Sequence, residues 1–229
     1  MYRFEDLRLR RFQFEDIPLK IKWINQDENN RYLGYDLPLE YEKTCRWFEG
    51  VKDREDRYDF VVEYQGRPVG LTGLVNVDTK NRKAGNYILT GELGYKGRGI
   101  GYRAGLLNFL YGFEVLGLNK LCGDIEVGNV ASLKRCRRLC GHVEGYLMDE
   151  RWRDGKPVDV YRVAYYKSEF TMPEGVYWEA DPLMDCHNLE IGGGVTPPDR
   201  NVCSCLFLFM PPRRGGTAYG KGEDERVPV

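Results

Sequence analysis

Residues 92 to 118, ELGYKGRGIGYRAGLLNFLYGFEVLGL, change from a strand-like run into a glycine-rich loop and then into an apolar helix. Behind the loop, apolar side chains recur at helical spacing at Ile100, Ala104, Leu107 and Tyr111. The loop from Lys96 to Gly101 therefore opens a helix, where four backbone N–H groups lack intrahelical acceptors and the helix dipole is positive. Glycine lets an anion approach such a backbone closely. The stretch predicts a diphosphate site at the start of a central helix.

Other interpretations of this loop compete with a diphosphate site of this kind. The P-loop pattern GxxxxGK[ST] is absent, which argues against that class of nucleotide hydrolase. Gly99, Gly101 and Ala104 satisfy the GxGxxA fingerprint of dinucleotide-binding folds, with Asp124 roughly 20 residues further on. That fingerprint normally follows the first strand of a parallel unit, whereas this loop follows an antiparallel meander near the middle of the chain. A turn that merely begins a packed helix is the remaining alternative.

The charge balance and the cysteine usage restrict the class of protein. The 229 residues include 34 basic and 35 acidic ones, so the chain has no overall charge that would attract nucleic acid or an anionic membrane. No apolar run reaches the roughly 20 residues of a membrane span, and the N-terminus is too charged for a signal peptide. The seven cysteines do not form a disulfide framework. A cytoplasmic protein with no nucleic-acid or membrane partner is predicted.

The remaining sequence predicts a mixed sheet with helices on its faces. Asp16 stands where an N-cap would open a helix, and residues 40 to 48 predict a second helix. Alternating apolar residues and turn signals predict the strands, namely 7–13, three antiparallel runs between 58 and 93, 119–127, and a hairpin with its tip at 154–156. Asn129 is expected to cap a short helix between the last two of these units.

The composition changes after about residue 172. Seven of the eleven prolines and the run Gly192–Gly194 lie in this tail, and no helical or strand period continues through it. We therefore divide the chain into a working domain, residues 1–171, and a Gly/Pro-rich extension, residues 172–229, which is expected to be poorly ordered. Removal of the extension should leave ligand binding intact.

A series of short motifs identifies a family resemblance. The K-x-x-G-x-G arrangement of Lys96, Gly99 and Gly101 resembles the acetyl-coenzyme A loop of the GNAT superfamily of N-acetyltransferases. Downstream, GNVAS at 128–132, VEG at 143–145 and RDGKPVD at 153–159 are similar to motifs of the branch that contains ribosomal-protein, polyamine and aminosugar acetyltransferases. The resemblance covers residues 5 to about 170. It implies an α/β (α+β) fold, with a mixed central sheet of about seven strands flanked by helices and with splayed fourth and fifth strands.

The resemblance also implies an activity and a set of coenzyme contacts. The activity is transfer of an acetyl group from acetyl-CoA directly to a primary amine, which could be a small molecule, an aminosugar or a protein N-terminus. A homodimer is a further possibility that relatives suggest. Lys134 or Arg135 could reach the ribose phosphate, although a solvated helix face is the alternative for both. The implied coenzyme-binding residues are Leu93, Lys96, Gly97, Arg98, Gly99, Ile100, Gly101, Asn129 and Ser132.

The catalytic residues are less well marked than the coenzyme loop. The resemblance assigns Ser132 as the hydroxyl that protonates the leaving thiolate. Cys136 stands where many relatives have a tyrosine, so the proton comes from Ser132 or from water. Arg151 occupies the position of a glutamate that acts in some relatives, so Glu92 and Glu126 remain as candidates for the base that takes the proton of the amine. These departures keep a second function open, a non-catalytic acyl-CoA-binding regulatory protein on the same fold.

Two further groups of residues invite an interpretation. The aromatic residues Trp23, Tyr32, Tyr35 and Trp47 either line an acceptor pocket or form the core between two helices. The tail residues Cys186, His187, Cys203 and Cys205 do not have a recognised metal-ligand spacing, and no metal is predicted.

Overall fold

Alternation of buried and exposed side chains builds the central sheet of the computed structural model, which describes residues 2–178. The nine strands have the order β7-β8-β6-β5-β4-β3-β2-β1-β9, and β5 and β6 are the parallel neighbours. The strands are β1 (Tyr2–Phe4), β2 (Leu7–Arg11), β3 (Arg57–Tyr64), β4 (Arg67–Asp78), β5 (Lys83–Thr90), β6 (Lys120–Glu126), β7 (His142–Arg153), β8 (Lys156–Tyr166) and β9 (Val176–Trp178). This mixed sheet confirms the predicted fold class.

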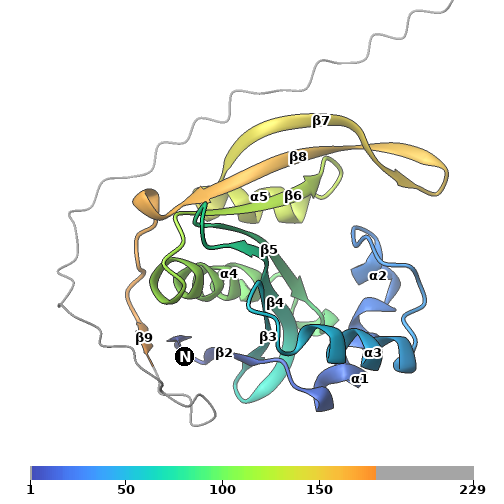
Figure 1. Cartoon of the computed structure of the whole chain (residues 1–229), viewed down its shortest axis with the longest axis horizontal. Coiled ribbons are helices and arrows are strands. Elements are labelled where there is room, and N and C mark those ends of the chain that lie inside the picture. Colours follow the sequence, from blue (N-terminus) through green and yellow to red (C-terminus); the bar gives the residue numbers. More distant parts are fainter. Residues whose placement is uncertain (1, 179–229) are drawn as a thin grey trace, which may run out of the picture.

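Helices cover both faces of the sheet (Figure 1). On one face lie α4 (Ile100–Leu110) and α5 (Val130–Arg138), and on the other lie α1 (Ile17–Ile24), α2 (Asp27–Asn30) and α3 (Tyr41–Val51). None of the helices within residues 2–178 combines the length and the apolar character needed to cross a bilayer.

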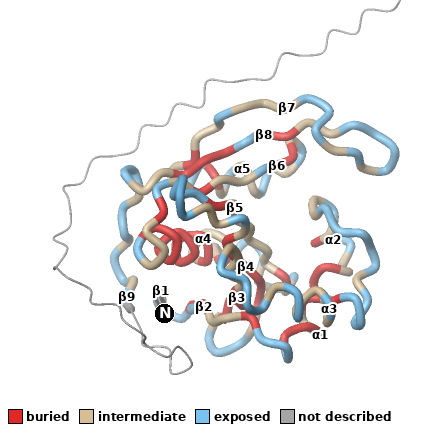
Figure 2. Tube along the Cα trace, viewed as in Figure 1, coloured by how far each residue is buried: buried red, intermediate tan, exposed pale blue. Residues whose placement is uncertain are grey.

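The core is divided between the two faces. The larger cluster packs α4 against the sheet, and Figure 2 shows this helix as largely buried. Its Leu107 and Phe109 side chains are completely buried. The smaller cluster surrounds Trp23 of α1, on the face that α1 and α3 cover. Each fully buried side chain of this size contributes about 1.5–3 kcal/mol. After Leu110 one π-helical turn, Tyr111–Val115, widens the helix, and Gly117 ends it with a φ of +64°.

The two N-terminal helices occur where the sequence predicts them, with differences in detail. The helix expected at residues 40 to 48 continues to Val51. Asp16 stands at the N-cap position of α1, but its side chain does not cap that helix. The Asp16 carboxylate instead accepts hydrogen bonds from the Arg10 guanidinium, at 2.6 and 2.7 Å, and from the Gln13 backbone N–H at 2.9 Å. A stronger charged partner from β2 has taken the place of the helix amides.

The sheet has two more strands than the predicted seven. β1 pairs with β2 and with β9, so three-residue strands from the two ends of the described chain complete one edge of the sheet. Between β8 and β9 the chain passes the π-helical turn that follows α4, where the Phe170 ring packs on Phe113 with 5.4 Å between centroids. The predicted boundary at residue 171 precedes β9, so the sheet continues into the first residues of the proposed extension. Most of that extension, residues 179–229, lies outside the described residues.

Truncation separates these two parts of the C-terminal segment. A chain that ends at Trp178 keeps β9, whereas a chain that ends at Thr171 loses its three residue pairs with β1. We expect the shorter chain to have a free energy of unfolding lower by about 1 kcal/mol, since three edge pairs and a half-buried Val176 contribute little more. Urea unfolding of both chains measures the difference. Equal stabilities would mean that β9 adds nothing to the fold.

Candidate active site

The parallel strands β5 and β6 separate after only three residue pairs, the last of which is Gly85 with Cys122. Beyond that point the Asn86 side chain donates to the Cys122 carbonyl at 2.7 Å and replaces the next bond of the ladder. The residues that follow on both strands line a cavity of about 710 Å³. This is the predicted splay between the fourth and fifth strands, which are β5 and β6 once the extra strand β1 is counted.

Residues of α4 and of α2, which lie on opposite faces of the sheet, both line the cavity, and successive side chains of a strand point to opposite sides. Ile88 and Thr90 face α4, where a Cβ atom on Gly105 or Gly101 would lie 3.0 and 3.5 Å from them. Tyr87 and Leu89 face the opposite side and pack against the smaller core cluster. Two ligands could therefore approach the same gap in the sheet from opposite faces.

The glycine-rich loop lies at the α4 mouth of the cavity. Gly97 and Gly99 have φ values of +79° and +76°, which only glycine adopts freely, and Gly99 is the N-cap of α4. The first-turn N–H groups of any helix have no intrahelical acceptor. The N-cap of α4 offers them no side-chain acceptor either. Of the predicted loop contacts, Leu93 and Arg98 do not line the cavity, and the Arg98 guanidinium lies over the Tyr95 ring. Those that do are Lys96, Gly97, Gly99, Ile100 and Gly101.

Arg135 reaches the glycine-rich loop from the neighbouring helix, α5. Its guanidinium donates to the Ser132 hydroxyl at 3.1 Å, and a Cβ atom on Gly101 would lie 3.5 Å from Nη1. Burial lowers the pKa of Arg135, and no carboxylate within residues 2–178 forms an ion pair with it. A partly buried cation beside unpaired helix amides is suited to a phosphate ligand. The basic run KRCRR in the sequence indicates a possible phosphate contact. The contact between Arg135 and the glycine-rich loop depends on the tertiary structure.

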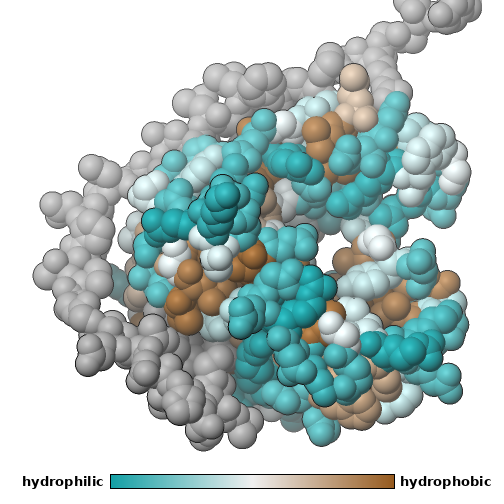
Figure 3. Space-filling model, viewed as in Figure 1, coloured by the Kyte–Doolittle hydropathy of each residue, from teal (hydrophilic) through white to brown (hydrophobic). Residues whose placement is uncertain are grey.

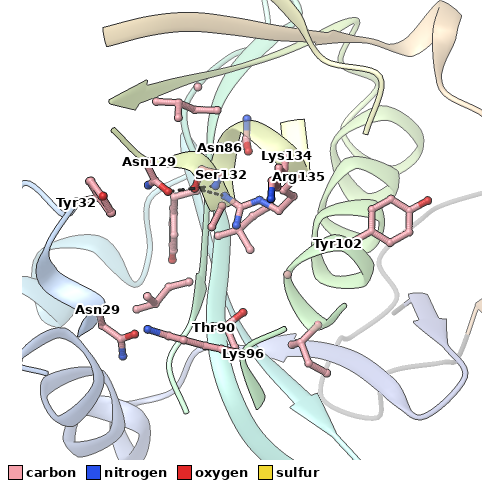
Figure 4. Close-up of a pocket in the computed structure, with 18 of the residues that line it drawn as sticks. Asn29, Tyr32, Asn86, Thr90, Lys96, Tyr102, Asn129, Ser132, Lys134 and Arg135 are labelled. Atoms are coloured by element: carbon pink, nitrogen blue, oxygen red, sulfur yellow. Dashed lines mark hydrogen bonds between the residues drawn. The ribbon is translucent and has the colours of Figure 1, made fainter. Parts of the chain in front are cut away.

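A second basic side chain lies on the rim of the same mouth. The Arg138 guanidinium stacks over the Tyr102 ring at 3.8 Å, and both residues line the cavity. Lys96, the first residue of the loop motif, points elsewhere, because its ammonium donates to the Glu28 carbonyl at 3.2 Å (Figure 4). Its side chain therefore links the loop to α2 on the opposite face.

Asn129 and Ser132 lie together at the start of α5 (Figure 4). The Asn129 side chain caps the helix by accepting the Ser132 N–H at 3.1 Å, as the sequence predicts, and both residues line the cavity. The Ser132 oxygen accepts from Arg135, which leaves its own hydroxyl proton for a further acceptor. Cys136 stands where relatives have a tyrosine. Its side chain is fully buried and is hydrogen-bonded to Tyr165, and burial raises the pKa of its thiol.

The two carboxylates predicted as bases have different environments. Glu92 accepts from the Lys22 ammonium at 2.5 Å and from the Trp23 indole at 2.7 Å, and these partners lower its pKa. Glu92 does not line the cavity, so the structure separates it from the other predicted site residues. Glu126 is buried, lines the cavity and is bonded to Arg153 at 2.6 Å.

The aromatic residues of the first third divide between the two alternatives. Trp23 is fully buried and belongs to the smaller core cluster, against which Trp47 packs. Tyr32 lines the cavity, whereas Tyr35 does not. Within residues 2–178 no three His, Cys, Asp or Glu side chains gather where they could hold a metal ion. The four tail residues Cys186, His187, Cys203 and Cys205 lie outside the described part of the chain.

Comparisons with known proteins agree with this geometry. Residues 6–140 match the sequence model of the acetyltransferase (GNAT) domain. The chain is 30% identical over 170 residues to the spermidine N(1)-acetyltransferase of Escherichia coli K12. The aligned region covers 72% of this chain and 88% of that protein. The mouse alpha/beta-tubulin-N-acetyltransferase 9 is 28% identical over 141 residues, covering 55% of this chain and 57% of its own length.

Solved structures share the fold. The spermidine N-acetyltransferase of Vibrio cholerae in complex with CoA and spermine superposes with a TM-score of 0.68 at 22% identity, over 72% of this chain and 97% of that one. A dodecameric structure of the Vibrio enzyme has a TM-score of 0.63 at 21% identity, over 72% of this chain and 95% of that one.

Proposed function

The chain belongs to the GNAT acetyltransferase family, as an acetyl-CoA-dependent N-acetyltransferase, and we propose that its two substrates meet in the splay between β5 and β6. The coenzyme would lie at the α4 mouth, with its diphosphate against the first turn of α4 and the Arg135 guanidinium. The acceptor amine would enter from the α2 face. The distribution of polar groups carries this proposal, since unpaired amides and Arg135 lie at one mouth, and the carboxylate of Glu126, which is paired with Arg153, lies towards the other.

The reaction needs little covalent participation by the protein. The amine nitrogen attacks the thioester carbonyl, the C–S bond breaks, and the nitrogen loses a proton while the thiolate gains one. Ser132 is placed to supply the thiolate's proton, because its hydroxyl lines the cavity and is oriented by Arg135. The cavity walls hold the two reactants together and keep bulk water away from the thioester.

Glu126 is the carboxylate we propose to receive the proton of the amine, directly or through a water molecule. Glu126→Gln is expected to lower kcat/KM for the amine about tenfold, the low end for a positioned proton acceptor, because Arg153 already shares its charge. The dissociation constant of CoA should not change. Glu92→Gln is the matched control and should stay within about twofold of the parent, since Glu92 lies outside the cavity lining.

Initial rates with varied amine, together with calorimetry for CoA, give both quantities for the two variants. A larger loss from Glu92→Gln than from Glu126→Gln would transfer the proton-accepting role to the α1 side. Thermal unfolding of each variant is the control for damage to the buried ion pair of Glu126.

We propose a polyamine as the acceptor to test first, on the strength of the similarity to spermidine N-acetyltransferases. Asp124 and Glu126 both line the cavity, but each has an arginine partner, Arg162 at 3.0 Å and Arg153 at 2.6 Å. This pairing leaves room for an acceptor with fewer positive charges, such as a peptide N-terminus. A homodimer stays a prediction for this chain, whereas the Vibrio relative has a dodecameric structure.

A thiol-release assay tests the proposed function. The protein is mixed with acetyl-CoA and with spermidine, glucosamine or a short peptide that has a free N-terminus, and the released thiol is followed with a chromogenic disulfide. We expect release that depends on the amine, with the highest kcat/KM for spermidine. Saturable binding of CoA without amine-dependent release would contradict the proposal and favour the regulatory alternative.

A further inference from the structure

The segment Glu28–Leu33, which includes most of α2, is attached to both sides of the splayed strands. On the β5 side, the Asn29 side chain donates to the Gly91 carbonyl at 2.7 Å, and the Lys96 ammonium donates to Glu28. Asn29 is 6% exposed and also bonds the Trp23 carbonyl at 2.9 Å. This end of the segment is firmly anchored to the strand and to α1.

On the β6 side the attachments are different in kind. The Tyr32 hydroxyl donates to the Gly128 carbonyl at 2.9 Å, and the Arg153 guanidinium reaches the Leu33 carbonyl at 3.3 and 3.4 Å. The Tyr32 bond is accessible to solvent, and a single hydrogen bond of that kind contributes little to stability, so it can open at small cost. The segment is therefore fixed at one end and lightly closed at the other.

The segment crosses the α2 mouth of the cavity. Gly91 directly follows β5 and Gly128 follows β6 by two residues, so the attachments of one six-residue segment span the open end of the splay. Glu28, Asn29, Tyr32 and Leu33 all line the cavity. Figure 4 shows Asn29 and Tyr32 together on the α2 side, and Figure 3 shows the surface hollowed between α2 and the β7–β8 hairpin.

Tyr32 is held at the β6 side of this mouth by its hydrogen bond to the Gly128 carbonyl. A Cβ atom added to Gly128 would be 3.8 Å from both the Tyr32 ring and its hydroxyl, which is ordinary contact distance. The ring therefore lies beside Gly128 at the β6 side of the mouth and is part of the cavity lining. Its removal would widen the mouth without touching the α4 mouth at the opposite face.

We propose that Glu28–Leu33 is a size-selecting gate for the acceptor, and that Tyr32 is the residue that sets its width. This inference rests on the proposed entry of the amine from the α2 face. A slender unbranched amine passes the closed gate, whereas an amine on a ring needs the Tyr32 contact to open. The closed gate also keeps water from the thioester.

The test compares Tyr32→Ala and Tyr32→Phe with the full-length parent chain. The ratio of kcat/KM for glucosamine to that for spermidine should rise about tenfold in Tyr32→Ala, a typical effect of widening a pocket, and about threefold in Tyr32→Phe, which loses only the hydrogen bond. Hydrolysis of acetyl-CoA without amine should also rise in Tyr32→Ala. The dissociation constant of CoA should stay within about twofold. Tyr41→Ala is the matched control, because Tyr41 is 52% exposed and does not line the cavity.

The outcomes separate the gate from the proposed function. If the parent acetylates either amine and the ratio does not change in Tyr32→Ala, the gate is overturned and the function stands. A uniform fall for both amines with weaker CoA binding also overturns the gate, since Tyr32 would then be merely structural. If the parent acetylates neither amine but hydrolysis still rises in Tyr32→Ala, the gate is supported and the proposed acceptor fails. With no amine turnover and no rise in hydrolysis, both proposals fall.

Discussion

Gly101→Asp should weaken binding of CoA at least about 100-fold while the domain keeps its fold. Gly101 is the second residue of α4, has no positive φ, and a Cβ atom there would sit in ordinary contact, 3.5 Å from Thr90 and Arg135. A carboxylate at this position is favourable for the helix dipole, so the fold should not suffer. The same carboxylate would repel a diphosphate and pair with Arg135, which removes the cation that the phosphates need.

Calorimetry with CoA measures the affinity, and thermal unfolding reports the fold. Gly94→Asp is the matched control, because Gly94 has no atom within 4 Å of an added Cβ and does not line the cavity. Gly99→Asp is less clean, since its φ of +76° adds backbone strain of about 1 kcal/mol. Unchanged affinity in Gly101→Asp would show that the diphosphate binds elsewhere.

Lys20→Met should raise the free energy of unfolding by about 3 kcal/mol at pH 6, and the gain should disappear towards pH 10.5. Lys20 is 5% exposed, and burial lowers its pKa from 10.5 to about 7, against the opposing effect of Asp59. Its ammonium lies 3.0 Å from the centre of the Trp47 ring, which favours the charged form and limits the cost of burial. Each unit of lowered pKa is equivalent to about 1.4 kcal/mol of destabilisation of the charged form. The charged Lys20 therefore costs the folded state a few kcal/mol.

The sign follows from proton linkage. Between pH 7 and 10.5 the unfolded chain holds the Lys20 proton and the folded chain does not, so the stability of the parent rises with pH across this window. Below pH 7 both states are protonated and the full cost of burial remains. Urea unfolding at pH 6, 8 and 10 of the parent and of Lys20→Met measures the effect, with Lys22→Met as a control at a side chain that is 52% exposed. Parallel pH profiles for the parent and Lys20→Met would contradict the assignment.

Local signals predicted the elements that depend on neighbouring residues in the chain. Asn129 caps α5, Gly155 has the positive φ of the last hairpin turn, and Gly99 opens α4. The strands β1 and β9 could not be predicted in this way. Each has three residues, and they pair with each other although more than 170 positions separate them, so no local periodicity marks them. The N-cap role of Asp16 failed for a related reason, since its partner Arg10 belongs to another element.

The part of the candidate site that consists of backbone groups could be predicted from the sequence. The positions of Gly97, Gly99 and Gly101 at the cavity follow from a loop that opens a helix, whatever the surrounding side chains. Side-chain contributions were harder to predict. Glu92 and Glu126 are both carboxylates close to strand ends, and only their partners, Lys22 for one and Arg153 for the other, distinguish them.

The sequence alone determines a mixed α/β fold with a glycine loop at the start of a central helix, because turn residues, caps and hydrophobic period act over a few positions. The acetyltransferase function came from the resemblance of its motifs to those of the GNAT family. Only the tertiary structure decides which charged groups reach the cavity. Arg135 meets Gly101 and Tyr32 meets Gly128 across distances of 34 and 96 positions along the chain. Such contacts arise because the splay of β5 and β6 breaks the backbone ladder and brings side chains from distant elements to the gap.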